Sequence, residues 1–162
     1  MKKQNLSLHV NIPALKNRNI KIGIVVSEWN EPITNALKEG ALTVLREAGI
    51  DKKQIVVISV PGSYELPFAV SMMMDADEMI DGIICLGCVI QGETRHFEFI
   101  SQAVANGIMR VSHDYGIPVS FGMLTCDTYE QAQERAGGKH GNKGEEAAYT
   151  CLKMIKLQQK LQ

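Results

Sequence analysis

Four short apolar runs rich in β-branched residues, separated by long segments of helical periodicity, constrain the fold of this chain more than any other feature. The runs cover residues 22–26, 55–60, 82–86 and 118–125. The connections are too long for hairpins, and strands joined through helices pair in parallel. We therefore expect an α/β protein in three α/β/α layers, with a four-stranded parallel sheet and helices on both faces.

The intervening segments predict the helices. Pro32 suits the first turn of a helix that ends at Gly49, with an apolar face formed by Ile33, Leu37, Ala41, Val44 and Leu45. Further helices are expected from Glu65 through the methionine run, over 95–115, over 129–136 with a cap at Asp127 or Thr128, and from about 142 onward. Glycines 87 and 92 are expected to break the third run, and glycines 137 and 138 to interrupt the fourth helix.

Length and charge limit the class of protein. A chain of 162 residues with 45% hydrophobic and 22% charged residues is typical of one globular domain. The net charge of −1 argues against nucleic acid or an anionic membrane as a partner. The chain contains neither a run of about 20 apolar residues nor a secretory signal, which predicts a cytoplasmic protein. We expect an N-terminal arm at 1–20, a single domain at 21–157 and a C-terminal tail at 158–162.

The four cysteines are expected to be buried structural thiols. Cys85 and Cys88 form a CxxC pattern, but Cys85 belongs to an apolar strand rather than to a helix start, where a redox motif would lie. A second pair that would complete a zinc site is missing from the sequence. We therefore expect neither a metal nor a disulfide framework.

The segment 87–96, GCVIQGETRH, joins the third strand to a helix through a glycine-containing loop. Free backbone N–H groups and the helix dipole at such a junction favour an anion such as phosphate. Thr94 adds a hydroxyl at the helix start, and His96 can exchange protons near neutral pH. The alternative is an ordinary turn followed by a solvated histidine.

In open parallel sheets, ligands bind beyond the carboxyl ends of the strands. Trp29 follows the first strand and suits stacking on a flat heterocycle, although it also suits packing on the core edge. Asn30 and Glu65 can hydrogen-bond a polar ring or a polyol, and Pro61-Gly62 is expected to leave the Ser63 backbone exposed and turned. Glu65 also suits a favourable position near a helix dipole.

The segment 130–144 is basic and rich in glycine. Arg135 can clamp a phosphate through two hydrogen bonds, whereas a helix C-terminus would also explain Arg135 and Lys139 without a ligand. This segment follows the fourth strand, so reaching a phosphate at the loop of His96 is expected to require a neighbouring subunit.

Four ordered motifs carry a resemblance to a known family: IVVSEWN at 24–30, VPGSYELPF at 60–68, GCVIQGETRH at 87–96 and EQAQERAGGKHGNKG at 130–144. Over about residues 20–157 the chain resembles the 6,7-dimethyl-8-ribityllumazine synthases of riboflavin biosynthesis. The resemblance implies a flavodoxin-like subunit. It also implies condensation of 5-amino-6-(D-ribitylamino)uracil with 3,4-dihydroxy-2-butanone 4-phosphate to give 6,7-dimethyl-8-ribityllumazine, phosphate and water, without metal or organic cofactor.

The resemblance also implies residue roles. His96 matches the proton-transferring histidine, Glu93 and Thr94 match the phosphate-binding pair, and Trp29 stands where the family usually has a phenylalanine stacked on the pyrimidine. The remaining residues of the pyrimidine and ribityl site would be Asn30, Ser63, Tyr64, Glu65, Cys88, Val89 and Ile90. An adjacent subunit would supply the aromatic Phe121 and the phosphate-binding Arg135, with Lys143 nearby. Glu93 suits a phosphate only if its N–H, rather than its carboxylate, points inward.

A site shared between subunits implies an obligate homo-oligomer. The resemblance implies pentamers, which in some members of the family assemble further into dimers of pentamers or 60-subunit shells. Residues 5–12 are expected to add an edge strand to a neighbour. Two other functions stay open on the sequence: a flavin-binding electron carrier, and a non-catalytic ligand-binding or shell-forming relative. The segment Glu28-Trp29-Asn30 disfavours the carrier, which would need a phosphate loop rich in Ser and Thr after the first strand.

Overall fold

The computed structural model describes residues 19–161. The expected N-terminal arm therefore lies almost entirely outside the described residues, and so does its segment 5–12. Ile20, at the end of that arm, is buried in the core beside the first strand.

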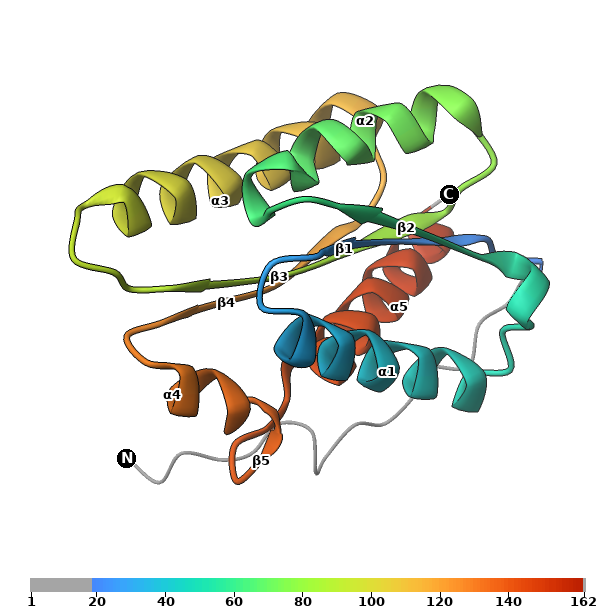
Figure 1. Cartoon of the computed structure of the whole chain (residues 1–162). Helices are drawn as coiled ribbons and strands as arrows, with labels where there is room; N and C mark the ends of the chain where they lie inside the picture. The colour runs from blue at the N-terminus through green and yellow to red at the C-terminus, as the bar shows by residue number, and fades with distance from the viewer. Residues whose placement is uncertain (1–18, 162) are drawn as a thin grey trace.

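A four-stranded parallel sheet forms the centre of the molecule (Figure 1). Its strands are β1 (Ile22–Ser27), β2 (Ile55–Val60), β3 (Gly82–Ile90) and β4 (Val119–Cys126). They pair in the order β2-β1-β3-β4, and every neighbouring pair is parallel. The predicted α/β class and the four parallel strands are confirmed.

Helices cover both faces of the sheet and complete three layers (Figure 1). The helices α2 (Leu66–Ala76) and α3 (His96–Tyr115) pack on one face around a core that includes Val25, Cys85 and Val104. The helices α1 (Glu31–Glu47) and α5 (Lys143–Leu161) cover the other face, together with the short α4 (Tyr129–Gln133). Because α5 continues to Leu161, most of the segment 158–162 is helical.

The α1 helix follows the predicted pattern closely. Proline stands in its first turn, its predicted apolar face is buried, and Gly49 leaves the helix with a positive φ of 79°. The 3-10 turn η2 (Lys52–Gln54) then leads into β2. The start of α5 crosses α1 so closely that a Cβ on Gly144 would lie 1.9 Å from the carbonyl oxygen of Leu37. Only glycine allows this approach of two backbones.

The prediction that β3 ends at Gly87 is wrong, because the strand continues to Ile90. A Cβ at position 87 would lie 2.6 Å from Oγ of Ser63, so this glycine makes room for a neighbouring loop instead of breaking the strand.

The segment after β4 also differs from its prediction. Thr128 caps α4 by accepting a hydrogen bond from the N–H of Gln131 (3.3 Å), but α4 ends at Gln133 rather than near 136. A small antiparallel pair follows, β5 (Ala136–Gly138) and β6 (Gly141–Asn142). Gly137 and Gly141 have φ values of 118° and 76° and turn the chain between α4 and α5, where the sequence predicts an interruption. The last helix begins at Lys143, close to its predicted start.

The four cysteines are buried free thiols, as predicted. Burial raises the pKa of Cys88 and of Cys151 to about 12, so neither is a reactive thiolate near neutral pH. None of the described helices is long and apolar enough to cross a membrane.

Candidate active site

The strand order places a topological switch point between β1 and β3. The chain leaves β1 toward α1 on one face of the sheet and leaves β3 toward α3 on the other face, and ligands of such sheets bind at this switch point beyond the carboxyl ends. The segments that follow β1 and β2 and the last residues of β3 meet there. These are the segments in which the sequence predicts the pyrimidine site.

Direct contacts join these three segments. The indole ring of Trp29 lies over Gly62, since a Cβ at position 62 would be 2.8 Å from Cε3 of the ring. The carboxylate of Glu65 accepts a hydrogen bond from the N–H of Gly62 (3.0 Å). The side-chain amide of Asn30 donates to the carbonyl oxygen of Cys88 (3.1 Å). The three strand ends therefore form one continuous surface.

The residues around this surface differ in their exposure to solvent. Trp29 is 67% exposed, and Tyr64, in the 3-10 turn η3 (Ser63–Glu65), is exposed as well. Val89 and Ile90 are half-buried at the end of β3. The expectation that the Ser63 backbone is exposed is wrong, because only 4% of the whole residue is accessible, and its side chain packs toward Gly87. A large aromatic face is thus open beside a closely packed turn.

The loop before α3 has the features of an anion site. The backbone N–H groups of Gly92, Glu93 and Thr94 make no hydrogen bond within residues 19–161. The Thr94 hydroxyl accepts a hydrogen bond from the N–H of His96 (3.3 Å), which begins α3. These N–H groups and the dipole of a 20-residue helix suit a phosphate.

His96 occupies the first position of α3 and is exposed. Its imidazole makes no hydrogen bond or ion pair with other residues of the described chain, so both ring nitrogens are available for proton transfer. The neighbouring Arg95 is directed elsewhere, because its guanidinium pairs with Glu98 (2.9 Å) and lies over the ring of Phe99. Glu93 is exposed, which leaves its carboxylate free to point into solvent.

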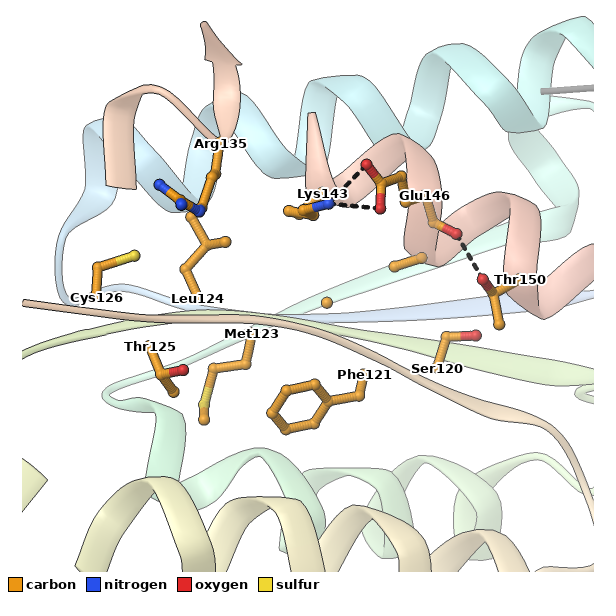
Figure 2. Close-up of a pocket in the computed structure, with 12 residues that line it drawn as sticks. Ser120, Phe121, Met123, Leu124, Thr125, Cys126, Arg135, Lys143, Glu146 and Thr150 are labelled. Carbon is orange, nitrogen blue, oxygen red and sulfur yellow. Dashed lines mark hydrogen bonds and ion pairs between the residues drawn. The ribbon is translucent and has the colours of Figure 1, made fainter. Parts of the chain in front are cut away.

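Phe121, Arg135 and Lys143 lie apart from this surface. They line a pocket formed by β4, the segment after α4 and the start of α5. Figure 2 shows Arg135 and Lys143 on one side of β4 and Phe121 on the other side. Phe121 is 45% exposed, and β4 is an edge strand of the sheet, so groups on both of its sides are accessible from beyond that edge.

The two cations of this pocket differ in their partners. The Nζ of Lys143 contacts both carboxylate oxygens of Glu146, at 2.7 and 2.8 Å (Figure 2). The guanidinium of Arg135 donates only to the carbonyl oxygen of Gln131 (2.9 Å) and pairs with no carboxylate in the described residues. Arg135 therefore keeps its charge and several donors available for a phosphate, whereas the charge of Lys143 is already compensated.

The predicted site residues thus fall into two groups within one subunit. His96 belongs to the helical layer on one face of the sheet, and Arg135 belongs to the layer on the other face (Figure 1). Sequence reasoning missed two contributors. Gly62 supports the ring of Trp29, and its place in a Pro-Gly pair signals only a turn. Glu146 neutralises Lys143, and the i,i+3 spacing of opposite charges was the available signal.

Residues 19–161 contain no group of three or more His, Cys, Asp or Glu side chains placed to hold a metal ion. The arrangement instead offers an exposed aromatic ring, a phosphate-type loop, a free histidine and a free arginine. Such groups suit the binding of a heterocycle and a phosphate ester with proton transfer between them.

The chain is similar to known proteins over most of its length. The sequence model of the family described as 6,7-dimethyl-8-ribityllumazine synthase matches residues 19–159. A 6,7-dimethyl-8-ribityllumazine synthase of Cytophaga hutchinsonii is 53% identical over 153 residues, which are 94% of each chain. The proteins of the same name from Porphyromonas gingivalis and Bacteroides fragilis are each 48% identical. These matches cover 87% of both chains for the former, and 84% of this chain and 94% of the relative for the latter.

Proposed function

This chain belongs to the 6,7-dimethyl-8-ribityllumazine synthase family, and we propose that it forms the lumazine at the carboxyl ends of β1, β2 and β3. It is a transferase of riboflavin biosynthesis that condenses 5-amino-6-(D-ribitylamino)uracil with 3,4-dihydroxy-2-butanone 4-phosphate. The observation that carries the site is the direct contact among the three segments to which the family's pyrimidine-binding residues correspond.

The pyrimidine stacks on the outer face of the Trp29 ring. That ring is exposed on one side and supported by Gly62 on the other, so a substrate ring can add to it without moving it. The backbone of residues 88–90 contacts the edge of the pyrimidine. Tyr64 and Glu65 lie at the end of β2, where the ribityl chain extends.

The phosphate of the second substrate binds the free N–H groups of residues 92–94 at the start of α3. Glu93 contributes its N–H and turns its exposed carboxylate to solvent. Arg135 of an adjacent subunit adds a charged clamp, because its guanidinium has no carboxylate partner in its own chain's described residues. Lys143 has a smaller part, since Glu146 already binds its ammonium group.

The chemistry requires proton transfers close to a departing phosphate. The pyrimidine amine attacks the butanone carbonyl and loses water to form an imine. A proton then leaves the adjacent carbon as phosphate departs, and ring closure with dehydration gives the lumazine. His96 carries these protons, because imidazole both donates and accepts near pH 7. Holding two substrates together contributes much of the rate, and the helix dipole with Arg135 stabilises the departing phosphate.

The separation of the two groups of residues supports a site shared between neighbouring subunits of a pentamer. An apolar surface at the free edge of β4, which includes Met109, Val119, Phe121 and Met154, suits burial against another subunit. At the other edge of the sheet, β2 exposes Val57 and pairs only with β1 among residues 19–161, which suits an added strand, the role expected for residues 5–12 of a neighbour. Pentamers can associate further, up to a 60-subunit shell.

A turnover assay tests the function. Purified protein is mixed with both substrates, and the lumazine is followed by absorbance and fluorescence against a no-enzyme control. We expect clear acceleration and a strongly raised KM for the butanone phosphate in Arg135→Ala. A rate equal to the control, from a folded oligomer, would contradict an active synthase and favour a binding or shell-forming role.

Mixed oligomers test the shared site. His96→Ala and Arg135→Ala subunits are unfolded together and reassembled. If adjacent subunits supply the two residues around a ring, about a quarter of the sites in a random mixture regain both. Activity should then exceed that of either variant reassembled alone. Activity that stays at the average of the two variants would contradict a shared site.

A further inference from the structure

The end of β3 extends beyond β1. The pairing of β1 with β3 stops at Val26 and Leu86, whereas β3 remains paired with β4 as far as Ile90 and Cys126. The last residues of β3 therefore have a strand neighbour on one side only. On the β1 side, the carbonyl oxygen of Cys88 accepts a hydrogen bond from the side-chain amide of Asn30 (3.1 Å). The Asn30 side chain thus supplies a donor to β3 where β1 no longer pairs with it.

The backbone of Asn30 is arranged for this contact. Its φ and ψ are 61° and 41°, and it is the only non-glycine residue with positive φ between residues 19 and 161. Asparagine adopts this left-handed conformation more readily than most residues. The carbonyl of Asn30 begins α1 by accepting from the N–H groups of Ile33 and Thr34. Its side chain does not cap the helix and extends to β3 instead.

This contact joins the segment after β1 to the end of β3, at the switch point where the proposed site lies. Trp29 immediately precedes Asn30, and Val89 and Ile90 immediately follow Cys88. The hydrogen bond therefore sets the separation between the ring on which the pyrimidine stacks and the strand end that contacts its edge. We propose that Asn30 is a positioning residue for the pyrimidine substrate and acts through the Cys88 carbonyl, rather than by holding substrate itself. This proposal rests on the proposed function.

Two variants separate the side-chain bond from the backbone conformation. Asn30→Gly keeps access to positive φ but removes the amide. Asn30→Asp keeps the shape and tolerates the same backbone, but it replaces the donor with a carboxylate oxygen facing a carbonyl oxygen. Asn35→Asp, at an exposed position of α1, is the matched control, because the same chemical change is made there on a side chain that does not bind the Cys88 carbonyl.

The steady-state test measures KM for each substrate separately. We expect both Asn30 variants to raise the KM for the pyrimidine roughly fivefold or more, since the carbonyl of the buried Cys88 loses its partner. The KM for the butanone phosphate should stay within about twofold of wild type, because the phosphate loop is not part of the contact. The Asn35→Asp control should match wild type in both constants. Equal increases in both KM values, or an unchanged pyrimidine KM, would overturn the proposal.

A second measurement uses the free protein. Trp29 is the only tryptophan, so its emission and its quenching by acrylamide report on this site alone. Loss of the contact should change both in the Asn30 variants and should speed amide hydrogen exchange at Val89 and Ile90. Unchanged emission and exchange would overturn the proposal even if turnover changed. If one variant fails to fold, the other decides the outcome. Absent wild-type turnover would count against the proposed function, whereas normal turnover in both Asn30 variants would count against this positioning role alone.

Discussion

Replacing Gly62 with alanine tests how the stacking ring is held. Position 62 has an extended backbone, with φ −134° and ψ 175°, so alanine is allowed there without strain. The added Cβ would lie 2.8 and 2.9 Å from Cε3 and Cζ3 of Trp29, and 3.0 Å from a carboxylate oxygen of Glu65. Carbon atoms in ordinary contact are about 3.5–4.0 Å apart. The indole must therefore retreat by roughly 0.7–1 Å.

The cost of this movement should fall on substrate binding rather than on folding. Trp29 is largely exposed, so its ring can shift without disturbing the core. A stacked aromatic pair contributes about 0.5–1.5 kcal/mol beyond area burial. Losing it would raise the KM for the pyrimidine about 2- to 10-fold. The free energy of unfolding should change by less than about 1 kcal/mol, because alanine also restricts the unfolded chain.

The assay is a double-variant cycle with Trp29→Phe. Phenylalanine lacks the fused second ring of the indole, so the methyl group at position 62 gains room beside it. Gly62→Ala should then raise the pyrimidine KM much less in the Trp29→Phe background than in wild type, with a coupling free energy of about 0.5 kcal/mol or more. If the two changes simply add, the ring does not rest on Gly62 as described, and the reasoning fails.

Three further predictions concern stability, the thiols and proton transfer. Gly144→Ala should lower the free energy of unfolding in urea by about 3 kcal/mol or more, because its Cβ would meet backbone atoms of α1. The control Gly92→Ala should be nearly neutral, because no atom lies within 4 Å of the added Cβ. Equal effects of the two substitutions on stability would contradict this account. The thiols of Cys88 and Cys151, whose pKa values burial raises to about 12, should react with a thiol reagent at pH 8 only after denaturation. These thiols stay protonated in the folded protein and ionise in the unfolded chain, so their contribution to stability is complete below the ordinary thiol pKa. The free energy of unfolding should therefore fall as the pH rises above that value. A free energy of unfolding that stays constant between pH 8 and 11 would count against the raised thiol pKa values. His96→Ala should lower kcat by about 10²-fold or more yet leave turnover above the no-enzyme rate, and complete loss with unchanged binding would show that proximity contributes less than proposed.

Much of the fold could be predicted because strands and helices leave local patterns. The β-branched runs of β1 and β2 and the apolar face of α1 depend on neighbours within a few positions. The predictions fail where a contact between residues far apart in the sequence determines the local structure. Gly87 suggests a break in the sequence but lies inside β3, where Ser63 packs against it. The β5–β6 pair replaces a predicted helix end, because the Asn142 amide binds the carbonyl of Ala36 and holds this turn against α1.

In the candidate site, too, some features follow from local sequence patterns and others depend on contacts between distant residues. The sequence by itself determined which segments follow the strands, and therefore that Trp29, Glu65 and His96 belong to strand-end loops. Only the tertiary structure decided that β1 and β3 are neighbours, so that Asn30 binds Cys88 across 58 positions. It also decided which cations keep a free charge, because ion pairing depends on where side chains lie. Periodicity records local geometry, whereas pairing between strands depends on the packing of the whole chain.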